Sequence, residues 1–225
     1  MTKFYESKDK LHVAVDCIVL GFENKKLKLL IGRRRFDPGK NEWSLYGGFV
    51  GHDESLKDAA NRVLRELTGL NNIYMRQVGA FGSIDRDPGE RVISVVYMAL
   101  INVADYDSSL LDKYGLIWTD IDSMPPLFSD HASMVKKAIE QLRDRISSEP
   151  LIFNLLPPLF TLSQLQLVYE TVLGEEIDKR NFRKRVKTML SIEKTELIDK
   201  ETSKRGAALY RFNKRSLGDT QKFKL

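Results

Sequence analysis

The chain has 225 residues, of which 42% are hydrophobic and 30% are charged, a composition that excludes collagen-like and intrinsically disordered proteins. Its single cysteine, Cys17, excludes an internal disulfide framework and fits a reducing compartment, and we expect this thiol to be buried in a strand. The start of the chain lacks the apolar core of a signal peptide, and no apolar run is long enough to span a membrane. We therefore expect a cytoplasmic protein without a membrane partner.

The net charge of +5 is unevenly distributed along the chain. Residues 150–225 contain 15 Lys and Arg against 9 Asp and Glu, whereas residues 1–149 contain 21 against 22. A basic last third attached to a nearly neutral remainder predicts a module that binds a polyanion. We therefore expect two domains, at 1–150 and 151–225.

Apolar runs of strand length alternate with helical patterns over the first 146 residues. Strands are predicted at 13–20, 27–31, 74–81, 92–101 and 116–118, with a hairpin turn between the first two. One helix is predicted from about Ser55 to Thr68, where Gly69 stops it, and another from an N-cap at Asp130 to about Ile146. Strands flanked by helices indicate the α/β class.

The pattern changes after residues 147–150, where Ser147-Ser-Glu-Pro150 breaks the last helix and marks a domain boundary at about 148–155. Two helices then follow at 162–173 and 179–190, with Gly174 between them. Short strands are predicted at 196–199 and 209–212, around a polar loop. Helix, turn, helix and a hairpin with a basic tip is the order of a winged helix-turn-helix.

The second of these helices carries an apolar stripe, Phe182, Val186, Met189 and Leu190, which is expected to face the core. Asp178 is predicted to cap the helix, so that Arg180 and Asn181 lie in the turn that usually meets base edges. Arg and Lys serve guanine or phosphate, and Asn reads adenine. The candidate DNA-binding residues of the opposite face are Arg180, Asn181, Arg183, Lys184, Lys187 and Thr188.

Two further groups support double-stranded DNA as the partner over a merely solvated basic face. Thr161, Ser163 and Gln164 at the start of the preceding helix are suited to phosphate oxygens. Lys204 and Arg205 lie at the expected tip of the wing. RNA is disfavoured because the sequence has no run of stacking aromatic residues.

Residues 48–70 resemble the signature box of the Nudix family, on Gly48, Glu54, Arg62, Leu64, Glu66, Gly69 and Leu70. Family members that hydrolyse diphosphates hold Mg²⁺ on carboxylates spaced along one helical face. Two of these three positions are Val63 and Leu67 here, and the proline that usually precedes the Gly-Gly pair is Tyr46. The chain is therefore predicted not to be an enzyme, with no catalytic residue, no metal site and no cofactor. Glu66 is predicted to pair with Arg62 or to line the former cleft.

The resemblance extends to the Nudix-related transcriptional regulators of NrtR type. It is carried by Trp43, by 47–50, by Thr68-Gly-Leu70 and above all by the segment from Arg86 to Tyr97. It implies an α/β Nudix-like sandwich, with a mixed sheet between helices, followed by a C-terminal winged helix-turn-helix domain. Branches of this family sense ADP-ribose, in regulators of NAD metabolism, or a pentose, in regulators of arabinose use. The degenerate box and Tyr46 favour the pentose branch, with L-arabinose as the effector.

The leading hypothesis is therefore a ligand-responsive transcriptional regulator that binds operator DNA as a homodimer, since one recognition helix reads too few bases. The alternatives are an ADP-ribose-sensing regulator of NAD metabolism, an active Nudix diphosphate hydrolase, and a structural DNA-binding protein without a ligand. Sugars are bound by aromatic rings, carboxylates and Arg forks. The candidate effector contacts are Tyr5, Arg34, Trp43, Tyr46 and Glu66.

Overall fold

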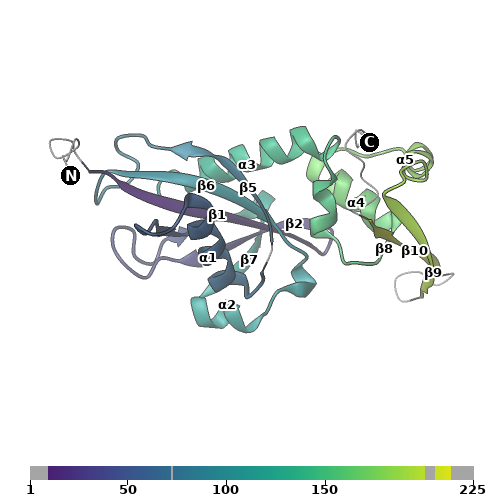
Figure 1. The fold of residues 1–225 in the computed structure, drawn as a ribbon, viewed down its shortest axis with the longest axis horizontal. Helices are drawn as coiled ribbons and strands as arrows, with labels where there is room; N and C mark the ends of the chain where they lie inside the picture. The colour runs from purple at the N-terminus through teal and green to yellow at the C-terminus, as the bar shows by residue number, and fades with distance from the viewer. Residues whose placement is uncertain (1–9, 72, 201–205, 214–225) are drawn as a thin grey trace.

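The structure is a computed structural model that describes residues 10–71, 73–200 and 206–213. Within these residues the first part of the chain forms a seven-stranded mixed sheet between helices, and the last part forms a smaller unit beside it (Figure 1). None of the helices in the described ranges is long and apolar enough to cross a membrane.

The sheet of the first part has the order β3-β2-β1-β6-β5, with β4 paired to β1 and β7 paired to β2. Its strands are β1 (His12–Glu23), β2 (Lys26–Arg33), β3 (Trp43–Ser44), β4 (Tyr46–Phe49), β5 (Tyr74–Phe81), β6 (Val92–Leu100) and β7 (Leu116–Asp120). All five predicted strands are present with slightly different ends. The first hairpin turn is shorter than expected, because Asn24 and Lys25 alone make it with positive φ angles of 50° and 62°.

Helices cover both faces of this sheet (Figure 1). They are α1 (Leu56–Thr68), α2 (Ser109–Tyr114) and α3 (His131–Ile146), with short 3-10 turns η1 (Val103–Asp105) and η2 (Ile121–Ser123). Side chains of β1 alternate between the two faces: Ile18 and Leu20 belong to the core under α3, whereas Cys17 and Val19 belong to the core under α1. The buried position predicted for Cys17 is confirmed, and burial raises the pKa of its thiol.

The second part has the winged-helix order that the sequence predicts. It contains η3 (Pro150–Leu155), β8 (Phe160–Thr161), α4 (Leu162–Leu173), α5 (Lys179–Val186), β9 (Ile192–Asp199) and β10 (Ala207–Phe212), with the sheet order β8-β10-β9. Two expectations were wrong. The recognition helix α5 ends at Val186 instead of Leu190, and Leu190, expected in the core, is 68% exposed.

One hydrophobic core runs through both parts of the chain. It joins Leu142 and Ile146 at the end of α3 to Leu165 and Val172 of α4. The Nε of Arg143 donates a 2.8 Å hydrogen bond to the carbonyl of Val172, and the tip of the β1–β2 hairpin also touches α4. The division expected at residue 150 falls at the start of η3, whose own side chains belong to this shared core.

A shared core predicts that both parts unfold together. Leu165→Ala removes a fully buried α4 side chain and should lower the free energy of unfolding by about 2–5 kcal/mol. Both tryptophans, Trp43 and Trp118, lie in the first part, so their fluorescence reports on the other part only through the shared core. In Leu165→Ala, the urea midpoint of tryptophan fluorescence should fall together with the midpoint of the helical circular dichroism signal. Leu197→Ala, on the exposed side of β9, should change neither midpoint. A tryptophan midpoint that stays at the wild-type value contradicts the single core.

Candidate functional site

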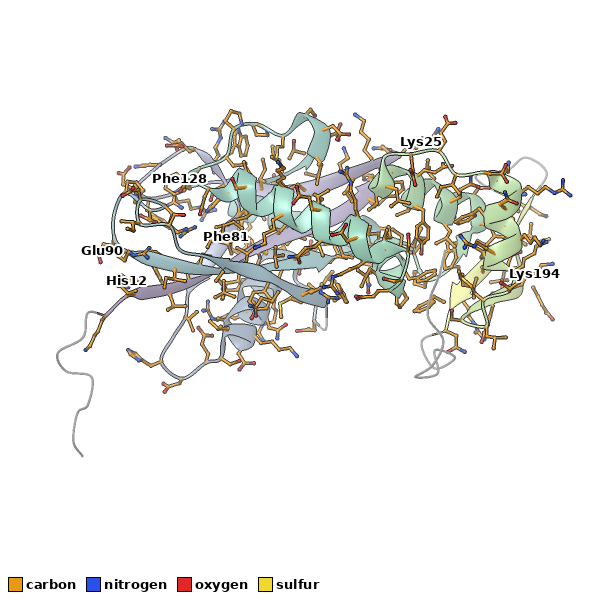
Figure 2. The ribbon with its side chains drawn as sticks, turned by 90° about the horizontal axis from the view of Figure 1, so that it is seen from above. His12, Lys25, Phe81, Glu90, Phe128 and Lys194 are labelled. Carbon is orange, nitrogen blue, oxygen red and sulfur yellow. The ribbon has the colours of Figure 1, made fainter. Side chains whose placement is uncertain are left out.

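A cavity of about 280 Å³ opens at the end of the sheet that lies away from the winged helix. Phe128, which lines this cavity, and Lys194 of the wing lie at opposite ends of the molecule in Figure 2. The walls come from β1, β2, β3, β4, the loop before β6 and the start of α3. The cavity therefore lies on the α3 face of the sheet, across from the Nudix-box helix α1.

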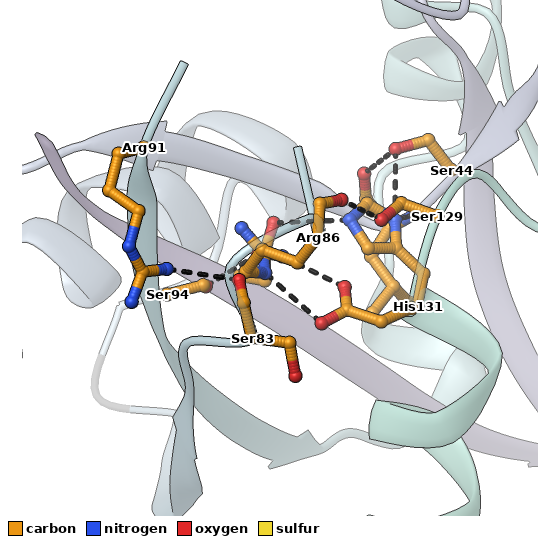
Figure 3. A network of polar contacts seen from close by, with 10 residues as sticks. Ser44, Ser83, Arg86, Arg91, Ser94, Ser129 and His131 are labelled. Carbon is orange, nitrogen blue, oxygen red and sulfur yellow. Dashed lines mark hydrogen bonds and ion pairs between the residues drawn. The ribbon is translucent and has the colours of Figure 1, made fainter. Parts of the chain in front are cut away.

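A buried carboxylate forms the floor of the cavity. Asp16 is only 8% exposed although the other residues of β1 from Val13 to Phe22 are apolar. Its Oδ2 accepts a 2.5 Å hydrogen bond from the hydroxyl of Ser94 and lies 3.7 Å from Nη2 of Arg86 (Figure 3). Arg86 in turn donates two hydrogen bonds, of 3.0 and 2.9 Å, to the carboxylate of Asp130. A buried charge is tolerated only when it is paired in this way.

His131 completes the floor from the first turn of α3. Its Nδ1 accepts a 3.1 Å hydrogen bond from the backbone N–H of Leu45 and lies 3.3 Å from the hydroxyl of Ser44 (Figure 3). Because Nδ1 is the acceptor, the proton of the neutral ring is on Nε2, which faces Oδ1 of Asp16 at 4.0 Å. Burial lowers the pKa of His131, and the carboxylates of Asp16 and Asp130 oppose this effect.

Strand β4 pairs with β1 beside Asp16, with which Gly47 is in register. A Cβ atom on Gly47 would lie 2.3 Å from Oδ1 of Asp16 and 2.4 Å from the carbonyl oxygen of Val15. Neither a backbone carbonyl nor a paired carboxylate can move far enough to relieve such contacts. This position therefore requires glycine. The buried acid therefore explains why the first residue of the Gly-Gly pair has no side chain.

Cations and aromatic rings surround the mouth of the cavity. The guanidinium of Arg34 lies 4.0 Å from the ring centroid of Phe128 and donates a 2.7 Å hydrogen bond to the carbonyl of Pro38. Phe36 and Phe49 also line the mouth and are largely exposed. Tyr46 contacts the ring of Tyr114 edge-on, and burial raises the pKa of its hydroxyl. Carboxylate, guanidinium and hydroxyl groups converging in a concave site suit a ligand rich in hydroxyl groups.

Of the five predicted effector contacts, Arg34 and Tyr46 line this cavity. Trp43 is on β3, where its ring packs under the guanidinium of Arg33 at 3.9 Å, and it does not line the cavity. Glu66 lies on α1 and does not line it either. Tyr5 is outside the described residues.

Sequence reasoning missed Asp16, Arg86 and His131 as site residues. The available signal was an aspartate inside an apolar strand, because a carboxylate is rarely buried without a partner. Asp130 does precede α3 as predicted, but its side chain makes no cap hydrogen bond because both of its oxygens bind Arg86.

The remnant of the Nudix box is organised by Glu54 and Arg62. Arg62 donates hydrogen bonds of 3.1 and 2.7 Å to the two oxygens of Glu54, and the backbone N–H of Gly51 adds a third. The bond to Arg62 and then that to Gly51 lower the pKa of Glu54 to about 2. Arg62 also pairs with Glu66, as predicted, but at the longer distance of 4.0 Å.

The two positions where the box lacks its glutamates face inward. Val63 and Leu67 are each 1% exposed and belong to the core between α1 and the sheet. Among the described residues, no group of three or more His, Cys, Asp or Glu side chains could hold a metal ion.

In the winged helix, all six predicted residues of the recognition helix are exposed. They are Arg180, Asn181, Arg183, Lys184, Lys187 and Thr188. Phe182 and Val186 are buried as expected, and Asp178 caps α5 through a 2.8 Å hydrogen bond from the backbone N–H of Asn181. The hydroxyl of Thr188 is committed to the carbonyl of Arg185 at 2.7 Å.

The residues at the start of α4 divide into two groups. Thr161 is buried, and it forms a reciprocal capping box with Gln164, with hydrogen bonds of 3.1 and 2.7 Å. In this cap the Thr161 hydroxyl oxygen is the acceptor, and its contact with phosphate stays a prediction. Ser163 is exposed and receives a 3.3 Å hydrogen bond from Arg183. Lys204 and Arg205 lie outside the described residues.

Comparison with known families matches both parts of the chain. The model of the Nudix domain matches residues 10–137, and the model of the NrtR DNA-binding winged helix domain matches residues 152–212. The combination of Nudix sandwich and winged helix implied by the resemblance is confirmed.

Two curated proteins are similar in sequence. The ADPR responsive transcriptional repressor NtrR of Acinetobacter baylyi is 34% identical over 204 residues, which cover 89% of this chain and 81% of that protein. An ADP-ribose pyrophosphatase of Methanocaldococcus jannaschii is 32% identical over 124 residues, which cover 55% of this chain and 70% of that protein.

Two solved structures share the fold over nearly the whole chain. Shewanella oneidensis NrtR complexed with a 27mer DNA has a TM-score of 0.83 and 28% identity, covering 91% of this chain and 94% of that one. A MutT/nudix family protein from Enterococcus faecalis has a TM-score of 0.73 and 24% identity, covering 93% and 91%, and supports the fold alone.

The lowered pKa of His131 predicts a pH-dependent stability. The unfolded chain binds a proton as the pH falls through about 6.5, whereas the folded chain resists it until a lower pH, so the free energy of unfolding should fall below pH 6.5. His131→Gln should flatten this dependence. His52→Gln, in an exposed loop, is the matched control and should leave it unchanged. Urea unfolding at several pH values gives the free energy of unfolding of both variants. If this free energy changes equally with pH in the two variants, the pH dependence does not come from His131.

Proposed function

The chain belongs to the NrtR-type Nudix regulators, and from that premise we propose that it is an effector-responsive transcriptional regulator that binds operator DNA. The observation that carries this proposal is the exposed basic face of α5 beside the wing. Such a helix, presented by a winged-helix scaffold, has the size and charge to enter a major groove. The 27mer DNA bound by the NrtR protein of Shewanella oneidensis supports the same partner here.

We also propose that two copies bind one near-palindromic operator. A single recognition helix reads too few bases for a specific site, and two-fold symmetry is the usual remedy. The complex then contains two chains for each operator.

The cavity at the far end of the sheet is the proposed effector site. Its floor offers the carboxylate of Asp16, the guanidinium of Arg86 and the imidazole Nε2–H of His131. These groups match the hydroxyl groups of a five-carbon sugar, which both ADP-ribose and a free pentose contain. Arg33, Arg34 and Arg35 at the mouth add charges suited to the diphosphate that only ADP-ribose carries.

ADP-ribose is the first candidate effector. Both curated relatives are named for ADP-ribose or ADPR, whereas neither is named for a free pentose. The preference for L-arabinose that the degenerate box suggested finds no support in them, and the ADP-ribose alternative fits them better.

A free pentose is the second candidate, because one observation favours it. The cavity of about 280 Å³ is near the lower end of the range for ligand sites, so its enclosed part suits a single sugar ring. An ADP-ribose molecule would place its remaining atoms outside, against Phe36 and Phe49.

We infer that the Nudix domain does not hydrolyse diphosphates. Mg²⁺ catalysis at the box needs several carboxylates on one helical face, and Val63 and Leu67 direct apolar side chains into the core instead. The rival function, an active hydrolase, is favoured by the similarity to the pyrophosphatase of Methanocaldococcus jannaschii, which makes its test necessary.

The regulatory proposal predicts a link between effector and operator. A duplex selected from a random pool serves as the operator, and ADP-ribose and L-arabinose are tested separately. One of them should raise the melting temperature of the protein and change its operator affinity by about 1–3 kcal/mol. Asp16→Asn should abolish both effects, while Asp122→Asn, on the exposed turn η2, should retain them. The effector site is rejected if either ligand acts equally on both variants, and the whole proposal is rejected if the protein selects no duplex.

The enzyme alternative predicts turnover, whereas our proposal predicts none. The protein is incubated with ADP-ribose and Mg²⁺ or Mn²⁺, and AMP and ribose 5-phosphate are followed by chromatography. We expect product at the level of the buffer control. Turnover near one per second, within the ordinary range for enzymes, would establish a hydrolase.

A further inference from the structure

A second cavity, a groove of about 530 Å³, separates the recognition helix from the wing. Lys179, Arg183 and Lys187 line it on the α5 side, and residues 206–208 of the wing line the other side. Ser163 lies at the start of α4 beside it, and none of the described residues that line the groove is acidic. Whatever occupies this groove therefore meets three positive charges.

The three cations form a line along the helix. They are spaced four residues apart, and four residues advance an α-helix by about 6 Å while returning nearly to the same face. Arg180 and Lys184 lie on the outward face of α5 and do not line the groove; they line a second shallow depression, to which Lys179, Arg183 and Lys187 also contribute. Arg185 is about 200° around the helix from Arg183 and lines neither cavity. The row of Lys179, Arg183 and Lys187 thus borders the groove, whereas Arg180, Lys184 and Arg185 do not.

One wall of the groove is held in place by a hydrogen bond, and the other carries mostly small side chains. The guanidinium of Arg183 is tied to the hydroxyl of Ser163 at 3.3 Å, which links α5 to α4. The opposite wall has small side chains at Gly206, Ala207 and Ala208, together with the larger Tyr210 of β10. Gly206 has a φ of +76°, and a Cβ there would lie 2.7 Å from a methyl carbon of Ile198. A chain of phosphates can approach such a wall closely, whereas a broad helix or sheet cannot.

We propose that this groove binds the phosphate backbone of one strand of duplex DNA through Lys179, Arg183 and Lys187. Arg180 and Lys184 on the outward face are then the cations that reach base edges. The inference rests on the proposed function. It divides the recognition helix into one face that contacts phosphates and another that contacts bases. It adds Lys179, which is not among the residues predicted from the sequence, and assigns Arg183 and Lys187 to phosphate, one of the two roles that the sequence leaves open.

Phosphate contacts have a signature that base contacts lack. Each neutralised phosphate releases counterions, so the logarithm of the binding constant falls with the logarithm of the salt concentration by about 0.9 per contact. The effect is independent of sequence, so it is measurable on random duplex DNA without knowledge of the operator.

The experiment measures fluorescence anisotropy of the full chain with a random-sequence duplex over a series of KCl concentrations. Lys179→Gln, Arg183→Gln and Lys187→Gln should each reduce the salt slope by about one per subunit. Arg185→Gln is the matched control, with the same loss of charge on another face of α5, and it should leave the slope unchanged. Arg183→Lys keeps the charge and should restore the slope of Arg183→Gln.

Two results would overturn the inference. One is an equal slope for Arg183→Gln and Arg185→Gln, which would show only a general attraction between charges. The other is an unchanged slope for both Lys179→Gln and Lys187→Gln in variants whose circular dichroism spectra match that of the wild type. A wild-type chain that binds no DNA would reject the proposed function itself, and the inference with it.

Discussion

A carboxylate buried in an apolar strand is the constraint around which the first part of the molecule is arranged. Removing a charge from water costs several kcal/mol unless partners compensate it. Asp16 obtains these partners from Ser94 on β6 and from Arg86 in the preceding loop, and Arg86 is itself held by Asp130 before α3. The same acid forces glycine onto β4 above it. One residue thus fixes a loop, a strand and the start of a helix around a single cavity.

Two elements connect that cavity to the winged helix. Strand β2 has Arg33 at its cavity end, and the hairpin that precedes the strand touches α4 through Lys25. Helix α3 has His131 at its cavity end and Arg143, bonded to α4, near its other end. Because packed interiors transmit strain, a displacement at either cavity end has a continuous path of contacts to the first helix of the DNA-binding part.

Local patterns in the sequence predicted the elements well, because their signals are carried by neighbouring residues. The capping box of Ser55 and Asp58 and the left-handed Gly69 bound α1 where the sequence indicates. The site was harder to predict, since Asp16, Arg86 and His131 are far apart in the chain and only the folded sheet brings them together. Leu190 misled the helix prediction, because its apolar character fits the stripe although the backbone leaves the helix before it. Trp43 was a plausible sugar contact by residue type, but Arg33 already covers its ring.

The burial of Val63 and Leu67 makes the absence of metal ligands difficult to reverse. A glutamate placed at either position would enter a filled apolar layer beside Val15, Cys17 and Ala60. Such an unpaired charge costs several kcal/mol, a large fraction of the stability of an ordinary domain. Restoring the acids of the box would therefore damage the scaffold before it could assemble a metal centre. Packing therefore opposes the return of these acids even one at a time.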